Sequence, residues 1–259
     1  MALGLNHALL IGTLVREPDL RYTPSGLAVL RLDLAGDDHL HDEAGTVRTR
    51  PWYQRATVFG SQAERVVDVL HVGTPLWLEG HLEQRRWEDG DGRARSSLEV
   101  VGRRVEVLEY GVRGDDDPVA IDARDQPRLR DAGNRTRLIG NLVRDVELRR
   151  IDEGATLARF SLAVQERTGE DAPAPHFVEI RAWRERARAL DGWERGTPVY
   201  VEGRLVNDAW TDAAGERRRA TRVEALRIER VRRPLPDTRA LADVGPDADE
   251  ASPAAAPPF

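Results

Sequence analysis

Residues 6–21 read NHALLIGTLVREPDLR, and residues 134–149 read NRTRLIGNLVRDVELR. The two stretches align without a gap at a displacement of 128 positions (134 minus 6), and more than half of their positions are identical. A period this long is that of a whole domain, because solenoid repeats run to only about 20–50 residues each. The sequence therefore predicts an internal duplication.

The correspondence continues well beyond these stretches. GLAVLRLDLA at residues 26–35 matches GATLARFSLA at residues 154–163. GTPLWLEGHL at residues 73–82 matches GTPVYVEGRL at residues 196–205. Because the matches keep the same order in both halves, each half is expected to form one complete domain of ordinary size.

Composition places the boundaries between these domains. The segment between the copies and the end of the chain are rich in Asp, Pro and Ala and carry few large apolar residues, which is typical of linkers and disordered tails. The expected division is a first domain at residues 1–110, an acidic linker at 111–132, a second domain at 133–232 and a disordered tail at 233–259 that ends in Pro-Pro-Phe.

The order of predicted elements in each copy indicates the fold. Three strands come first, then a short helix, then a hairpin of two strands, which is the order of a five-stranded OB barrel. The fold class is therefore expected to be all-β, with two tandem OB barrels and one short helix in each. In the first copy the expected strands are residues 9–15, 28–34, 52–59, 76–87 and 93–108, with a helix at 61–70 and a long exposed loop at 36–50.

Composition also excludes several classes of protein. The chain has no cysteine, so disulfides and thiolate metal sites are excluded, and no metal or cofactor is expected. No stretch of about 18 apolar residues and no signal peptide is present, so we expect a soluble, cytoplasmic protein without membrane contact. Six histidines show no metal-binding spacing, which argues against a hydrolase or nuclease, so the chain is not expected to be an enzyme.

Charge is distributed unevenly over the copies. The chain has a net charge of −6, and all 39 of its basic residues are arginine. Residues 1–110 carry a net charge of −4, whereas residues 133–233 carry +4. If both domains bind a polyanion, the second is therefore expected to contribute more of the affinity.

Aromatic and arginine side chains recur on the outer faces of the predicted barrels. In a strand with period two, the apolar residues that face the core leave Tyr53 and Phe59 on the outside, and likewise Phe177 and Trp183 in the second copy. Such rings beside arginines suit single-stranded nucleic acid, because bases stack on the rings and arginines contact phosphates. The candidate binding residues are Tyr53, Arg55, Phe59, Arg85, Arg86, Trp87, Phe177, Arg181, Trp183, Arg204, Trp210, Arg217 and Arg218.

Two other interpretations of the aromatic residues remain open. Trp77 and Tyr200 also alternate outward, where they could cover the barrel or make subunit contacts, so the chain could be an OB-fold scaffold. An RNA-binding paralogue is also compatible with the residues, because stacking on aromatic rings does not separate RNA from DNA.

Several motifs resemble those of bacterial single-stranded-DNA-binding proteins (SSBs). NHALLIGTLVREPDLRYTPSG, WYQRATVFG, GTPLWLEGHL and RRWEDGDGR follow one another in the family's order. Two such domains in one chain resemble the SSBs that work as homodimers with four OB folds. The family's stacking rings correspond to the aromatic candidates above, although residues 36–50 contain no counterpart of a further family tryptophan.

This resemblance implies a function and partners. It implies binding and protection of single-stranded DNA in replication, recombination and repair, without strong sequence preference, by a protein associated with the nucleoid. Similar proteins end in a short acidic segment that closes on Pro-Phe and recruits replication and repair proteins. Here Pro257, Pro258 and Phe259 provide the apolar tip, but the nearest acids lie seven or more residues upstream.

Overall fold

The structure is a computed structural model of the chain. It describes residues 4–41, 45–88, 90, 92, 94–109, 117–151, 154–165, 175–211, 215 and 217–231. Within these ranges the side chains of residues 40, 41, 86, 87, 94, 95, 210 and 217–219 are not described.

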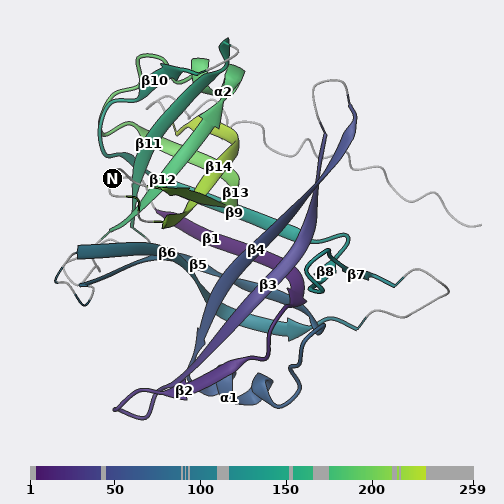
Figure 1. Ribbon diagram of the computed structural model, residues 1–259. Helices are drawn as coiled ribbons and strands as arrows, with labels where there is room; N and C mark the ends of the chain where they lie inside the picture. The colour runs from purple at the N-terminus through teal and green to yellow at the C-terminus, as the bar shows by residue number, and fades with distance from the viewer. Residues whose placement is uncertain are drawn as a thin grey trace, which may run out of the picture.

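Two barrels of similar design follow one another along the chain (Figure 1). The first contains β1 (Leu5–Leu14), β2 (Asp19–Tyr22), β3 (Ala28–His41), β4 (Val47–Phe59), α1 (Ser61–Val67), β5 (Pro75–Glu88) and β6 (Ala94–Val107). A short hairpin of β7 (Val119–Ile121) and β8 (Pro127–Leu129) separates the two. The second contains β9 (Gly133–Leu142), β10 (Glu147–Arg150), β11 (Thr156–Val164), β12 (His176–Trp183), α2 (Arg184–Arg188), β13 (Pro198–Thr211) and β14 (Arg217–Arg230).

Each barrel closes through the same pairings. In the first, β1 pairs with β5, β5 with β6, β6 with β4, β4 with β3, and β3 returns to β1. In the second, β9, β13, β14, β12 and β11 close in the same cycle. The β4–β6 and β12–β14 pairings are parallel, and the other pairings in these cycles are antiparallel. The structure therefore confirms the predicted tandem five-stranded barrels.

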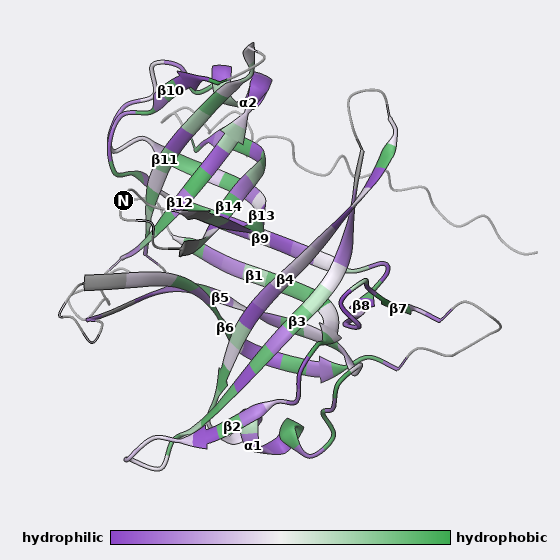
Figure 2. Cartoon of the chain, in the orientation of Figure 1, coloured by the Kyte–Doolittle hydropathy of each residue, from purple (hydrophilic) through white to green (hydrophobic). Residues whose placement is uncertain are grey.

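Alternation of apolar residues creates the two cores. Along the strands, hydrophobic and hydrophilic residues follow one another with period two (Figure 2). Leu30, Leu32 and Leu34 in β3 are fully buried, as are Leu76 and Leu78 in β5. The second core is built in the same way around buried residues that include Phe160, Leu162, Ile180, Val199 and Val201.

The two barrels are joined edge to edge by their first strands. β1 pairs antiparallel with β9 from Leu5↔Ile139 to Ile11↔Gly133. At the centre of this register lie Ala8 and Thr136, which occupy equivalent positions in the duplicated sequence and are both buried. A register centred on equivalent residues makes the pairing symmetric, so the two barrels are related by an approximate two-fold axis.

The asparagine that opens each repeated stretch completes a strand in its own barrel. The Nδ2 of Asn6 donates to the carbonyl of Leu82 at 2.8 Å, and its Oδ1 accepts from the Leu82 N–H at 2.9 Å. Asn134 makes the same pair of bonds to Leu205, both at 2.9 Å. Both asparagines are buried, so each amide side chain serves as a strand partner for backbone that would otherwise be left unpaired.

A bulge at the glycine of the repeated Glu-Gly pair accounts for the hydrogen bonds from the asparagine side chains. The register of β5 shifts between Glu79 and Gly80, and that of β13 shifts between Glu202 and Gly203. A Cβ on Gly80 would lie 1.9 Å from the carbonyl oxygen of Val101, so only glycine fits this bulge. Beyond each bulge, the asparagine side chain satisfies the backbone of the displaced strand.

One expected loop is in fact a ribbon. Residues 36–50 were predicted to form a long exposed connection, but β3 runs to His41 and β4 begins at Val47, with pairing up to His41↔Val47. Asp37 and Asp38 are buried, at 7% and 1% exposure, because the linker and the second barrel cover them. The prediction was wrong because polar residues were taken as solvated, whereas partners distant in sequence enclose them.

The linker also contains structure that the sequence did not predict. β7 and β8 form a hairpin, and β8 pairs with β3 through Gly36↔Leu129. Leu129 is 1% exposed and anchors the hairpin to the first barrel. One buried leucine in a polar segment was enough to fix a conformation that composition alone did not indicate.

We expect Asn6→Ala and Asn134→Ala each to lower the free energy of unfolding by about 1–3 kcal/mol, because each leaves a buried N–H and C=O unpaired. Urea unfolding followed by circular dichroism measures this change. As a control, Thr49→Ala, on the exposed ribbon, should change stability by less than about 0.5 kcal/mol. A loss no larger than that of the control would contradict the bridging role of the asparagines.

Candidate nucleic-acid interface

The outer rings of β4 and β12 occupy equivalent places in the two barrels. The neighbouring strand in each barrel contains the repeated segment of residues 26–35 or 154–163. Phe59 and Trp183 each pair with the fourth residue of this segment, and Tyr53 and Phe177 each pair with its last residue. Phe59 is 42% exposed, and the other three rings are half-buried. Each barrel therefore presents two aromatic side chains at matched positions along one strand.

A groove lies beside Phe59 on the first barrel. It has a volume of about 360 Å³, and its lining includes Arg21, Tyr22, Arg31, Phe59 and Arg85 together with Glu83 and Glu99. The three arginines come from β2, β3 and β5, so three elements converge on one ring. A groove that combines cations with exposed aromatic rings can hold a phosphate backbone while a base stacks on a ring.

The second barrel has a smaller groove at the equivalent place. It has a volume of about 210 Å³ and includes Arg144, Arg149 and Arg159 in its lining, together with Glu147 and Glu179. Arg149 and Arg159 are the duplicate counterparts of the two arginines that β2 and β3 contribute in the first barrel. Arg21, Arg31, Arg149 and Arg159 were not among the candidates chosen from the sequence. Their occurrence at matching positions in both copies was a signal that could have identified them.

The predicted arginines of the outer strands are engaged with acids. Arg55 binds Asp33 across β3 and β4 at 2.9 Å, and this hydrogen bond raises the pKa of the Arg55 guanidinium. Arg181 lies 2.6 Å from Asp208, while burial lowers the pKa of its guanidinium. These two arginines are not at equivalent positions, because the residue that corresponds to Arg55 is Glu179. Their charges are partly neutralised within the protein.

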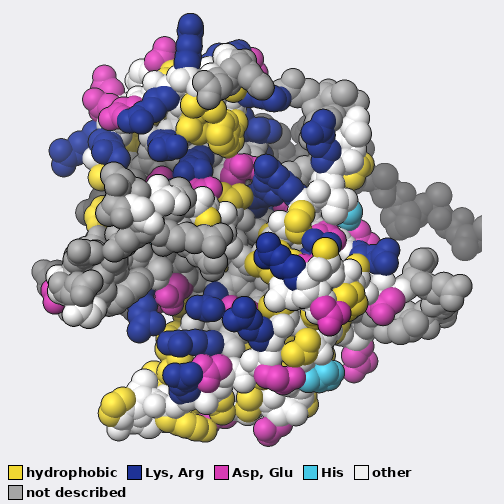
Figure 3. All heavy atoms as spheres, in the orientation of Figure 1, with side chains coloured by type: hydrophobic (Ala, Val, Ile, Leu, Met, Phe, Trp, Pro, Cys, Tyr) yellow, Lys and Arg dark blue, Asp and Glu magenta, His cyan; other side chains and the backbone are white. Residues whose placement is uncertain are grey.

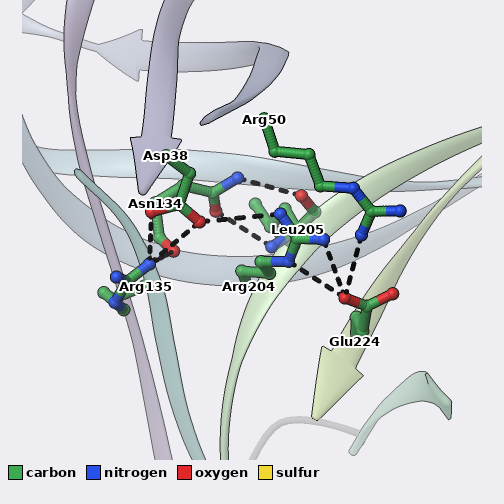
Figure 4. Close-up of polar contacts among 7 residues, drawn as sticks. All are labelled: Asp38, Arg50, Asn134, Arg135, Arg204, Leu205 and Glu224. Carbon is green, nitrogen blue, oxygen red and sulfur yellow. Dashed lines mark hydrogen bonds and ion pairs between the residues drawn. The ribbon is translucent and has the colours of Figure 1, made fainter. Parts of the chain in front are cut away.

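Arg204 does not lie on the outer face. Its side chain is 3% exposed, so the prediction that it contacts nucleic acid is wrong. Its Nη2 lies 2.7 Å from Glu224, and its Nη1 lies 3.6 Å from Asp38 of the other barrel (Figure 4). Arg204 was selected because it lies near the aromatic candidates in sequence, and that nearness does not reveal that Glu224 of its own copy and Asp38 of the other copy enclose it.

Arg204 belongs to a polar cluster that joins the barrels. Figure 4 shows Asp38 between Arg204 and Arg135. The Nη1 of Arg135 donates to the two carboxylate oxygens of Asp38 at 2.8 and 3.1 Å. Arg50 of β4 reaches Glu224 of β14 at 3.4 Å. The buried carboxylate of Asp38, at 1% exposure, is therefore compensated by two arginines of the second barrel.

The hairpin of β5 and β6 and the hairpin of β13 and β14 each form an arm of their barrel. The remaining predicted residues of these two arms are described only in their backbones. In β5 Trp87 pairs with Arg95, and in β13 Trp210 pairs with Arg218, so both tryptophans occupy equivalent places near the arm ends. The side chains that lie outside the described part are those of Arg86, Trp87, Trp210, Arg217 and Arg218. Pro257, Pro258 and Phe259 lie wholly outside the described residues.

Each arm reaches the outer strand of the other barrel. The backbone N–H of Gln84 in β5 donates to Nδ1 of His176 in β12 at 3.3 Å. At the equivalent position of the other arm, the Nδ2 of Asn207 donates to the carbonyl of Tyr53 in β4. The arm that carries Trp87 therefore passes beside the aromatic strand of the second barrel, and the arm that carries Trp210 passes beside that of the first.

The view in Figure 3 shows how charge lies on one face. Arginine side chains, in dark blue, gather over both barrels, with hydrophobic side chains between them. In the part of the chain that the structure describes, no group of three or more His, Asp or Glu could hold a metal ion. None of the described helices is long and apolar enough to cross a membrane. Asp and Glu side chains, in magenta, lie among the arginines, so this face carries charges of both signs.

Comparison with known proteins matches both copies. A sequence model described as the "Single-strand binding protein family" matches residues 5–108 and 133–231. A single-stranded DNA-binding protein from Thermus aquaticus is 48% identical over 231 residues, which span 89% of this chain and 86% of the relative. One from Deinococcus radiodurans is 38% identical over 238 residues, 90% of this chain and 77% of the relative.

A solved structure agrees with the fold. The crystal structure of the wild-type single-stranded DNA binding protein from Thermus aquaticus superposes with a TM-score of 0.71 at 41% identity. The match covers 90% of this chain and 95% of the other.

We expect Arg204→Met to lower the free energy of unfolding by about 3–5 kcal/mol, because it removes one of two cations that compensate a buried carboxylate. Denaturant unfolding measures this loss. The matched control is Arg227→Met, since Arg227 is exposed and pairs with Glu229 at 3.3 Å on the surface. That change should cost no more than about 1 kcal/mol. Similar losses in both variants would contradict the structural role of Arg204.

Proposed function

This chain belongs to the single-strand binding protein family, and on that premise we propose that it binds single-stranded DNA with little sequence preference and protects it in replication, recombination and repair. The observation that carries the proposal is the matched row of rings on β4 and β12. On the first barrel Phe59 lies in a groove with three arginines, and on the second barrel Arg149 and Arg159 line a groove of their own. The relatives from Thermus and Deinococcus are named for single-stranded DNA binding.

The mechanism needs only stacking and charge. Bases stack on Phe59 and Trp183, each stack contributing about 1–3 kcal/mol without reading sequence. Phosphates contact Arg21 and Arg31 on the first barrel and Arg149 and Arg159 on the second. The family is a non-enzymatic DNA-binding one, which confirms the sequence-based expectation that the chain is not an enzyme.

The geometry supports a path that uses both barrels. Because each arm contacts the outer strand of the other barrel, a strand of DNA that leaves one aromatic row meets an arm that leads to the next. The side chains that the sequence analysis selected in those arms are Arg85, Arg86 and Trp87 in one, and Trp210, Arg217 and Arg218 in the other. The same pathway would bring Tyr53, Arg55, Phe177 and Arg181 close to the DNA.

Three finer features complete the proposal. The second barrel contributes more affinity, because residues 133–233 carry a net charge of +4 against −4 for residues 1–110. The chain works as a homodimer in the cytoplasm, associated with the nucleoid. Its end, Pro257, Pro258 and Phe259, recruits replication and repair proteins, as the Pro-Phe ending and the acids upstream of it suggest.

We expect strong quenching of tryptophan fluorescence when poly-dT is titrated into the protein, because bases stack on tryptophan rings. Quenching should saturate at a defined number of nucleotides per protein and weaken at higher salt. Trp183→Ala should remove part of the signal, whereas Trp193→Phe should not weaken binding, because Trp193 packs against the core beneath Arg230. Absence of both quenching and a mobility shift would favour the scaffold alternative, and tighter binding of poly-U would favour the RNA-binding one.

We expect Arg31→Ala and Arg159→Ala to flatten the dependence of log K on log salt by about 0.7 for each phosphate that the protein no longer neutralises. The affinity loss should be larger for Arg159→Ala if the second barrel dominates. Fluorescence titrations at several salt concentrations measure both quantities. Arg227→Ala, an exposed arginine away from both grooves, is the control and should leave the slope unchanged. Equal slopes in all variants would refute the groove assignment.

A further inference from the structure

The linker hairpin is fixed to the first barrel at its base. Leu129 of β8 is buried, and the Arg128 guanidinium lies 3.3 Å from the buried Asp37 of β3. The N–H of Ala132 donates to the carbonyl of Asp37 at 3.3 Å. Among the described strands β7 pairs only with β8, so β8 alone joins β7 to the sheet.

The turn of this hairpin presents a preorganised carboxylate. The Oδ1 of Asp122 accepts from the backbone N–H groups of Arg124 and Gln126 at 2.7 and 3.0 Å. Its other oxygen is left to face the barrel, where it accepts the hydroxyl hydrogen of Tyr53. The turn therefore holds one carboxylate oxygen in place and aims the other at a residue of β4.

Tyr53 is one of the aromatic candidates that the proposed path brings close to the DNA. Burial raises the pKa of its phenol, and the bond to Asp122 raises it further. The Tyr53 hydroxyl in turn is the main cause that lowers the pKa of the Asp122 carboxyl, so the phenol stays neutral and the carboxylate stays charged at neutral pH. Phe177, at the equivalent position of the second barrel, has no hydroxyl and cannot be held in this way.

The turn at residues 122–126 carries a net negative charge. Asp122 and Asp125 outnumber Arg124 within it, and the neighbouring Arg128 lies 3.3 Å from Asp37, so a phosphate placed near the turn is repelled. A binding-competent state that is populated in only a fraction of molecules weakens the apparent affinity by that fraction.

We propose that the turn at residues 122–126 is a gate in cis over the first barrel, in which Asp122 holds Tyr53 by its hydroxyl and excludes nucleic acid until the turn is displaced. This inference rests on the proposed binding of single-stranded DNA. It gives the first barrel a weaker, conditional site.

Three substitutions in the full-length chain test the gate. Asp122→Asn keeps the oxygen that the turn needs but removes the charge that holds Tyr53. Tyr53→Phe keeps the ring and removes the hydroxyl. The control, Asp125→Asn, removes the same charge from the same turn, and asparagine tolerates the positive φ of 59° found there.

Each variant is combined with Phe177→Ala and Trp183→Ala, which weaken stacking on the second barrel. The probe is an oligo-dT of about ten nucleotides, within the roughly 4–16 that one OB fold covers. We expect Asp122→Asn and Tyr53→Phe each to tighten binding about tenfold, and Asp125→Asn to change it by less than about twofold. Spectrophotometric titration of the phenols should show that Asp122→Asn lowers the pKa of Tyr53.

The outcomes separate the gate from the proposed function. If the unsubstituted chain binds no single-stranded DNA, the proposed function fails. If it binds, but Asp122→Asn and Tyr53→Phe bind as the parent does, the gate is overturned alone. An equal gain from Asp125→Asn would assign the effect to bulk charge and also overturn the gate, as would an unchanged pKa of Tyr53 in Asp122→Asn. Weaker binding by Tyr53→Phe would show that the hydroxyl serves DNA rather than closing the gate.

Discussion

The antiparallel pairing of β1 with β9 is the contact on which the rest of the arrangement depends. Each of these strands gives one edge to its own barrel and most of the other edge to the neighbouring barrel. Because Ala8 and Thr136 face each other at the centre, the barrels are placed by a two-fold relation that the duplication makes available. That relation brings Gln84 and Asn207, at equivalent positions, to the outer strand of the opposite barrel.

The two copies depart from this symmetry in charged residues and in the linker. Arg204 is buried between Asp38 and Glu224, whereas the equivalent residue of the first barrel is His81. Among the described residues, the linker hairpin pairs with β3 of the first barrel and reaches Tyr53 of β4. The apolar cores and the asparagine bridges remain duplicated. The two copies therefore kept the interactions that form a barrel and diverged in those that set how each outer face is used.

Much of the fold and part of the site could be predicted because both follow from local patterns. The period-two alternation placed Tyr53 and Phe59 on the outside of β4, and the structure finds them there. Nearness in sequence to the aromatic candidates was a poor guide for Arg204, because its acidic partners bury it between the barrels. Prediction also failed for the ribbon at residues 36–50 and for the hairpin around Leu129, where the covering partner is distant in the sequence.

The sequence by itself determined that two barrels of the same strand order follow one another, which residues face each core, and where the matched rings lie. Only the tertiary structure decided that the barrels share one continuous sheet, that Arg204 is buried, and that Asp122 reaches Tyr53. The physical reason is the range of the interactions. Side-chain alternation is a property of neighbouring residues, whereas the pairing of a strand edge or a buried charge depends on which distant group the fold brings within a few ångströms.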